Sequence, residues 1–209
     1  MTSSDLDEFG QTLREQSRDY DVELSDSSMS RLEQYFQLLQ RWNERLHLVA
    51  TCSPAEFASR HILESLVALH HLEQDAVIAD IGSGGGLPII PILIAAPTAR
   101  AVLIDSSKKK AVFLQEALRV TELTDRAEVV AERFENVPTP QVSVVTCRAL
   151  EKFVELLPGI VHWKPASAKL LLFGGVDLQK QIGQQELTFI AEKLPHSERR
   201  FLFVIDQRR

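Results

Sequence analysis

The sequence predicts an α/β fold built on a mostly parallel, doubly wound sheet, and three observations support this prediction. First, five short runs of β-branched or aliphatic residues occur between residues 76 and 173: AVIADI, RAVLID, AEVVAE, VSVVTC and AKLLLF. Second, segments with helical spacing or turn residues separate these runs, and strands that alternate with helices form parallel sheets. Third, the first run leads into the glycine-rich segment DIGSGGGLP, which ends at a helix start, as in Rossmann-like folds.

Residues 1–26 differ from the rest of the chain in charge. They contain eight acidic and two basic residues, a balance equal to the net charge of −6 for the whole chain. The remaining residues are neutral in sum, with local basic clusters such as Lys108–Lys110 and Arg199–Arg200. Net charge therefore neither excludes nor supports an RNA partner. We expect an acidic N-terminal tail over residues 1–26, either mobile or partly helical.

Residues 27–74 are expected to form a helical extension that precedes the sheet. Apolar residues recur every three to four positions from Ser30 to Leu48, which predicts one amphipathic helix after the segment LSDSSMS. A second helix is predicted from Ser59 to His71, with His70 at the end of its buried stripe. The segment EQD then leads into a domain that covers residues 75–209.

Two helices and a hairpin are predicted within this domain. The helix after the first strand starts near Pro88, where a missing backbone N–H costs nothing, and ends at Pro97. The next helix covers Lys108 to Val120 and is predicted to bury Val112. The segments ELTFIAEKLP and RRFLFVID flank a turn-like PHSE, which favours a C-terminal β-hairpin, with a helix for the first arm as the alternative.

Cysteine usage and the apolar runs indicate a cytoplasmic protein. Cys52 and Cys147 are 95 positions apart without Cys-x-x-Cys spacing, which argues against a disulfide framework or a metal site. The longest apolar run, LPIIPILIAAP, is interrupted by prolines and is shorter than the roughly 18 residues of a membrane span. We therefore expect a cytoplasmic monomer that binds no metal and no membrane.

The glycine-rich segment lies where open α/β sheets bind their ligands, between a strand end and a helix N-terminus. The dinucleotide fingerprint Gly-x-Gly-x-x-Gly fails at its third glycine, because Leu87 stands there after Gly82 and Gly84. A phosphate-binding loop of the Walker type would need Lys and then Ser or Thr, but Leu-Pro-Ile follows the glycines. For the glycines alone, a tight turn without a ligand is the remaining alternative.

Two acidic residues narrow the choice of ligand. Asp80 precedes the alternating glycines Gly82, Gly84 and Gly86, and Asp105 ends the second strand. An acid at the tip of the neighbouring strand can accept both ribose hydroxyls of a nucleoside. Asp80 can order the loop or reach the ammonium group of a methionine moiety. This combination predicts S-adenosylmethionine as the cofactor.

Six ordered blocks, from about Leu38 to the C-terminus, resemble the bacterial 16S rRNA guanine-N7 methyltransferases, also called glucose-inhibited division protein B. The blocks are LLQRWNERLHLVA, RHILESL, DIGSGGGLPIIPILI, DSSKKKAVFL, ERFENV and CRAL. The resemblance implies a Rossmann-like class I methyltransferase. It also implies that the methyl group of S-adenosylmethionine is transferred to N7 of a guanine in 16S rRNA of the small ribosomal subunit.

The resemblance carries site residues with it. It places cofactor contacts at Gly82, Leu87, Phe134, Glu135 and Arg148. We take as candidate RNA contacts Arg60, His61, Lys109 and Arg200. Lysines at a helix N-terminus oppose the helix dipole, so Lys108–Lys110 indicate an anionic partner. The structural alternatives are a core role for Phe134 and His61, and solvated positions for Glu135 and the lysines.

Guanine N7 has a free lone pair and no proton, so its methylation needs alignment but no general base. Arg148, at the carboxyl end of the fourth strand, is the candidate catalytic residue, since a guanidinium can hold the methionine carboxylate or a guanine edge. The alternative is a surface arginine paired with Glu151. Cys147 could suggest the nucleophile of a cytosine-C5 methyltransferase, but its place at the end of a buried strand favours a structural role.

Several positions depart from the family pattern. Ile89 stands in place of a glycine, and Glu64 in place of an aspartate. Phe173 and Asp206 replace two lysines, which removes two expected cationic contacts to RNA phosphate. These departures leave two alternative functions open: a methyltransferase for another RNA or a small molecule, and an S-adenosylmethionine-binding module without catalysis.

Overall fold

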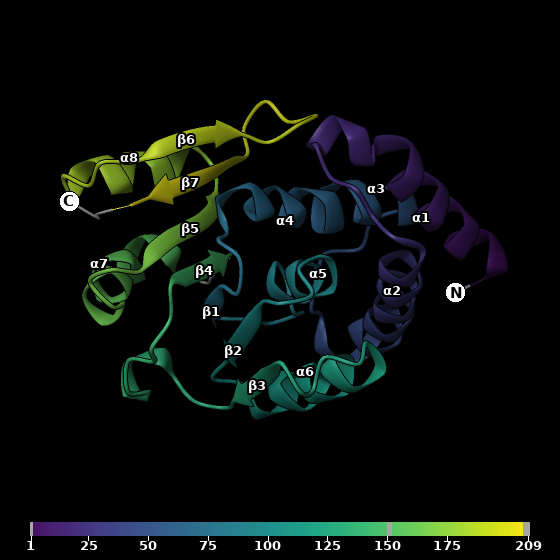
Figure 1. Cartoon of the computed structure of the whole chain (residues 1–209), viewed down its shortest axis with the longest axis horizontal. Helices are drawn as coiled ribbons and strands as arrows, with labels where there is room; N and C mark the ends of the chain where they lie inside the picture. The colour runs from purple at the N-terminus through teal and green to yellow at the C-terminus, as the bar shows by residue number, and fades with distance from the viewer. Residues whose placement is uncertain (1, 150–151, 207–209) are drawn as a thin grey trace.

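The computed structural model describes residues 2–149 and 152–206, in which helices cover both faces of a central sheet (Figure 1). The strands are β1 (Val77–Ile81), β2 (Arg100–Ile104), β3 (Ala127–Val130), β4 (Val144–Arg148), β5 (Lys169–Gly174), β6 (Ile190–Lys193) and β7 (Phe201–Ile205). The longer helices are α1 (Ser3–Gln16), α2 (Asp26–Leu46), α5 (Ile89–Ala95), α6 (Lys108–Val120), α7 (Phe153–Trp163) and α8 (Val176–Gln184). The predicted α/β class is confirmed.

The sheet has the strand order β3-β2-β1-β4-β5-β7-β6. Strands β1 to β5 pair in parallel, whereas β7 pairs antiparallel with both β5 and β6, which confirms the predicted C-terminal hairpin. The chain leaves β1 toward β2 and β3 and then returns to β4 on the other side of β1. The carboxyl ends of β1, β2 and β4 therefore border the crevice where such sheets bind ligands.

Buried side chains form two apolar clusters, one on each face of the sheet. The first joins α1, α2, α5 and α6 to inward residues such as Ile78 and Leu103, and the second joins α7 and α8 to residues such as Ala79 and Val145. Cys147 is fully buried in the second cluster, as its predicted structural role requires. Ile89, at the start of α5, is also fully buried, so this departure from the family pattern fills the core.

The acidic residues 1–26 contain a packed helix. Helix α1 is closed at its N-terminus by a capping box between Thr2 and Asp5. Its inner face buries Phe9 completely, and the Phe9 ring stacks on Phe36 of α2 with 4.4 Å between centroids. Phe36 in turn contacts Phe57 at 5.0 Å. Of the two conformations that the sequence allows for this segment, the structure has the helical one.

The second part of the extension is a single helical run over residues 54–71. It consists of α3 (Pro54–Glu56), the π-helical η2 (Phe57–Leu63), α4 (Glu64–Leu66) and the 3-10 helix η3 (Val67–His71). The predicted start at Ser59 is therefore late, because Ser53 caps the helix N-terminus by accepting a hydrogen bond from the Glu56 N–H. The predicted burial of His70 is wrong: its side chain is exposed and contacts the Asp21 carbonyl.

Helix α6 has its predicted bounds, but the predicted burial of Val112 is wrong. Val112 is 53% exposed, and the neighbouring Phe113 is fully buried instead. The Phe113 ring meets Trp42 of α2 edge-on, with 5.8 Å between centroids. Phe113 thus takes the buried position against α2 in place of Val112, and the sequence of α6 alone does not contain that contact. Within the described residues, no helix is long and apolar enough to cross a bilayer.

We predict that Phe9→Ala lowers the free energy of unfolding by about 3–5 kcal/mol, because it removes a fully buried ring and its stacking partner loses contact. Urea denaturation followed by circular dichroism measures this change. The control is Gln11→Ala on the exposed side of α1. Equal stability of the two variants would show that α1 does not contribute to the core.

Candidate functional site

The glycine loop after β1 is held in shape by its own backbone. Gly82, Gly84 and Gly86 all have positive φ, which residues with a Cβ rarely adopt. The backbone N–H groups of Gly82 and Ser83 donate to the Ile104 carbonyl at 2.8 and 3.1 Å, so the loop is tied to the end of β2. A Cβ at Gly86 would also overlap with Ile90, so this position requires glycine for space as well as for conformation.

Asp105 connects β2 to this loop. Its carboxylate accepts hydrogen bonds from the Gly84 and Ser107 backbone N–H groups, both at 2.8 Å, and the residue is 7% exposed. Each carboxylate oxygen has a further lone pair, so the same group can still accept from ribose hydroxyls. On the opposite side of the loop, the buried Tyr35 hydroxyl of α2 donates to the Gly85 carbonyl. The loop is therefore braced from both sides.

Asp80 at the end of β1 is a buried carboxylate with one oxygen satisfied. Its Oδ1 accepts from the Thr146 hydroxyl of β4 at 2.7 Å, while Oδ2 has no hydrogen-bond partner among the described residues. Burial is the main cause that raises the pKa of Asp80 to about 7, and the hydrogen bond from Thr146 acts in the opposite direction. A cation placed at Oδ2 would offset the free-energy cost of burying the ionised carboxylate, because it stabilises that form.

Arg148 lies at the end of β4 in a buried ion network. Its guanidinium donates to Glu64 Oε2 at 3.1 Å, to the Ser65 hydroxyl at 3.2 Å and to the Arg60 carbonyl at 2.6 Å. The other Glu64 oxygen accepts from Arg200 Nε at 2.7 Å, and Glu64 is fully buried. The anticipated alternative of a surface arginine is wrong, because the Arg148 side chain is only 13% exposed and pairs with the buried Glu64; its expected partner Glu151 lies outside the described residues.

Phe173, which stands where the family pattern has a lysine, lies beneath Arg148. The centre of its ring is 5.5 Å from the Arg148 guanidinium carbon, a cation–π distance. A lysine at this position would bring a further cation to the network, beside Arg148 and Arg200, instead of an aromatic face. The substitution therefore removes one positive charge and supports Arg148 with an apolar ring.

Three of the four candidate RNA residues meet at this network. Arg60 is exposed and pairs with Glu56, while Arg200 reaches Glu64 from the hairpin. Burial, together with the nearby Arg148, Arg60 and Arg200, lowers the pKa of His61 to about 3. His61 is therefore a neutral imidazole at physiological pH, and its buried Nδ1 has no partner among the described residues. It cannot act as a cation toward phosphate.

The remaining candidates lie elsewhere around the crevice. Lys109 is exposed in the first turn of α6, on the β2 side of the glycine loop. Phe134 is buried in the second apolar cluster and meets Trp163 edge-on at 5.9 Å. Glu135 is exposed and lies 3.8 Å from Arg133. Phe134 and Glu135 thus match their structural alternatives, a core ring and a solvated carboxylate, while Leu87 is buried behind the loop.

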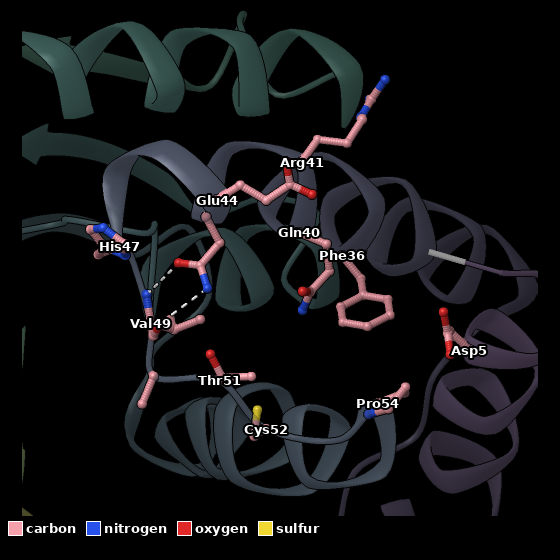
Figure 2. Close-up of a pocket in the computed structure, with 12 residues that line it drawn as sticks. Asp5, Phe36, Gln40, Arg41, Glu44, His47, Val49, Thr51, Cys52 and Pro54 are labelled. Carbon is pink, nitrogen blue, oxygen red and sulfur yellow. Dashed lines mark hydrogen bonds between the residues drawn. The ribbon is translucent and has the colours of Figure 1, made fainter.

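A pocket of about 470 Å³ lies between α1, α2 and residues 47–54 (Figure 2). The Asn43 amide accepts from the Val49 N–H at 2.9 Å and donates to the Val49 carbonyl at 3.0 Å, shown by the dashed lines in Figure 2. Asn43 thereby fixes residues 47–49, and Leu48 packs within 3.4 Å of the position a Cβ would take at Gly85. The pocket and the glycine loop thus lie on opposite sides of this segment.

The fold is that of S-adenosylmethionine-dependent methyltransferases. The chain is similar to the solved structure of a mitomycin 7-O-methyltransferase, with a TM-score of 0.61 and 15% identity over 82% of this chain and 60% of that one. It is also similar to a SAM-dependent methyltransferase from Aquifex aeolicus, with a TM-score of 0.58 and 11% identity over 72% of this chain and 93% of that one. At such low identities the likeness concerns the fold.

The chain belongs to the family of rRNA small subunit methyltransferase G, whose model matches residues 28–203. A ribosomal RNA small subunit methyltransferase G from Neisseria meningitidis serogroup B is 33% identical over 174 residues, 83% of each chain. The protein of the same name from Nitrosospira multiformis is 33% identical over 181 residues, also 83% of each chain. The expected family and its cofactor, S-adenosylmethionine, are confirmed.

Sequence reasoning missed several residues that shape this site. Glu64 was noted only as a departure from the family pattern, although it is the shared anion of Arg148 and Arg200. Tyr35 and Thr146 were not singled out, because one lies on an amphipathic helix and the other within a strand. A charged residue inside the apolar segment HILESLVAL was the one available signal for Glu64, since a buried carboxylate requires a cationic partner.

We predict that Glu64→Gln lowers the free energy of unfolding by about 3–5 kcal/mol, because it leaves the buried Arg148 without its counter-charge and weakens the bond to Arg200. The matched control is Glu56→Gln, which breaks the exposed pair with Arg60 one helical segment earlier and should cost less than about 1 kcal/mol. Chemical denaturation of both variants measures the difference. Similar losses in the two variants would contradict a structural role for the buried network.

Proposed function

We propose that this protein transfers a methyl group to N7 of a guanine in 16S rRNA of the small ribosomal subunit, as a cytoplasmic monomer. Membership of the rRNA small subunit methyltransferase G family supports rRNA as the substrate class. The single observation that carries the proposal is the place of the arginines. Arg148 and Arg200 pair with Glu64, and both of them and Arg60 lie close enough to His61 to lower its pKa, so an anionic substrate would meet positive charge next to the methyl donor.

The residues present fit S-adenosylmethionine. When bound, this cofactor supplies an electrophilic methyl group on a sulfonium sulfur. The three glycines keep side chains away from the loop, Asp105 offers carboxylate lone pairs for ribose hydroxyls, and Asp80 offers its unpartnered Oδ2 for the ammonium group. We assign Leu87 to the apolar wall of this site, and we keep Phe134 and Glu135 as candidates for the adenine.

Arg148 is the proposed catalytic residue. Three acceptors from residues 60–65 occupy part of its guanidinium, which fixes its position at the end of β4. A guanidinium has five N–H donors, so donors remain for the methionine carboxylate or for O6 of guanine. Arg60, His61, Lys109 and Arg200 are the proposed RNA contacts, with neutral His61 as an uncharged hydrogen-bonding group.

Methylation of guanine N7 is compatible with the weak basicity of His61 at this site. N7 has a lone pair and no proton, so the reaction needs in-line alignment and no proton acceptor. His61, with its pKa lowered to about 3, is a weak base and is suited to contact rather than to proton removal. Ile89 and Phe173, which suggested a loss of catalysis, have structural roles in the core and beneath Arg148.

The direct test is methyl transfer to small ribosomal subunits from cells that lack this gene. With tritiated S-adenosylmethionine, we expect label in 16S rRNA as 7-methylguanine, mapped to one nucleotide by aniline cleavage. The controls are subunits from cells that contain the gene, free 16S rRNA and a small-metabolite extract. Label in another RNA or in a metabolite, with none in the subunit, would overturn the ribosomal assignment.

We predict that the affinity for S-adenosylmethionine rises with pH through about 7, because the pKa of free Asp80 is raised to about 7 and only its ionised form pairs with an ammonium group. The ordinary pKa of Asp80 is 3.8. Between this pH and about pH 7, the folded protein binds more protons at Asp80 than the unfolded chain does, so the contribution of Asp80 to stability falls as pH rises. Asp80→Asn should weaken cofactor binding and flatten both pH dependences.

Isothermal titration calorimetry at about pH 6 and pH 8 measures the cofactor affinity, and thermal unfolding at the same pH values measures stability. The control is Asp177→Asn, whose carboxylate is exposed on α8. A pH dependence of cofactor binding that survives in Asp80→Asn would remove Asp80 from the ammonium site.

A further inference from the structure

A groove of about 670 Å³ runs between α2 and α6, on the face of the sheet that carries the helical extension. Trp42, one of the residues that line it, contacts the buried Phe113. The groove is lined by three arginines, one carboxylate and a set of apolar or amide side chains: Arg41, Arg45, Arg119, Glu116, Leu38, Trp42, Leu46, Val112 and Gln115. It is therefore both cationic and partly apolar.

Helices α2 and α6 are antiparallel, and this arrangement places one end of the groove near the cofactor crevice. At one end, Arg31 near the start of α2 pairs with Glu122 just after α6, at 2.8 Å. At the other end, the last turn of α2 lies beside the first half of α6, where Arg45 and Val112 line the same groove. Because α6 begins three residues after Asp105, the groove starts at the edge of the sheet that holds the glycine loop.

One exposed face of α6 continues along the groove. Lys108, Val112, Gln115 and Arg119 follow each other at intervals of four, three and four residues, and all four are exposed. They lie on one side of the helix, over a length of roughly 16 Å at 1.5 Å per residue. Such a length covers several nucleotides of an RNA strand.

The charges of the groove favour an anion. Arg41 and Arg45 are exposed on α2, and neither forms an ion pair with any residue that the structure describes. Arg119 binds Glu116 through two hydrogen bonds of 2.7 and 2.9 Å, and Arg41 lowers the pKa of Glu116 as a weaker influence. The groove thus has an excess of positive charge on a chain whose net charge is −6.

We propose that this groove, defined by Arg41, Arg45 and Arg119, binds the sugar-phosphate backbone of the substrate RNA outside the methylated nucleotide. The proposal rests on the proposed function. Arginines bind phosphate as forked donors, and the exposed Val112 together with the half-buried Trp42 provides an apolar surface for a ribose or an unstacked base. An acidic protein segment could also pair with these arginines. It would not explain why the groove begins at the edge of the sheet that holds the cofactor crevice.

Arg41 lines both this groove and the neighbouring pocket. In Figure 2 its side chain extends from α2 away from Phe36, Thr51 and Cys52 of the pocket. Changing it should leave the glycine loop intact.

The test compares the wild-type protein with the triple variant Arg41→Gln, Arg45→Gln and Arg119→Gln on small subunits that lack the methylation. We expect the KM for the subunit to rise at least tenfold, with kcat, S-adenosylmethionine affinity and melting temperature nearly unchanged. The slope of log binding constant against log salt concentration should fall in magnitude by about 2, since three cations are removed at roughly 0.7 per phosphate contact.

Two matched variants sharpen this test. Arg14→Gln, Lys180→Gln and Lys193→Gln together remove the same charge from α1, α8 and the hairpin, where the side chains are exposed, and should leave the KM and the salt slope unchanged. Glu116→Gln frees Arg119 from its carboxylate and should lower the KM several-fold. An unchanged KM and salt slope in the triple groove variant, with wild-type activity intact, would overturn the proposal.

A photo-crosslinking residue at Gln115, in the centre of the exposed face of α6, identifies the partner. Crosslinks to 16S rRNA support the proposal, whereas crosslinks to a ribosomal protein alone overturn it. Failure of the proposed function is a separate result, because the wild-type protein itself would then place no methyl group in 16S rRNA.

Discussion

The buried carboxylate of Glu64 is the group on which the arrangement of the site depends. It accepts from Arg148 of β4 and from Arg200 before β7, and thereby joins the helical extension to two strands that are not adjacent in the sheet. A buried carboxylate is costly in free energy unless cations and hydrogen bonds surround it. Those requirements allow few alternative positions for residues 60–65, so the network specifies where the extension lies as well as holding it there.

The glycine loop shows a second constraint of the same kind. Its backbone donors are engaged by the Ile104 carbonyl and by Asp105, and its outer side is held by Tyr35 and Leu48 from the extension. The loop therefore has its shape without a ligand, which reduces the ordering cost of cofactor binding. The extension consequently shapes the proposed cofactor site as well as covering one face of the sheet.

Acidic and basic residues concentrate in different parts of the molecule. Negative charge concentrates in the first 26 residues, where α1 packs through Phe9 onto α2 and η2. Positive charge gathers around Glu64 at the crevice and along the groove between α2 and α6. The overall value of −6 is thus a poor guide to partners, because the acidic and basic residues occupy different parts of the surface.

The sequence by itself determined the alternation of strands and helices, the closing hairpin, the glycine loop and the family, because local periodicity, turn residues and ordered motifs specify these features. Only the tertiary structure decided that Val112 is exposed and Phe113 buried, that α1 packs onto the extension, and that Arg148 pairs with Glu64. These outcomes depend on contacts between residues that are far apart in the chain. Residues 64 and 148 have no periodic relation that sequence spacing could reveal, and only the crossing of the extension over the ends of β1 and β4 brings their charges together.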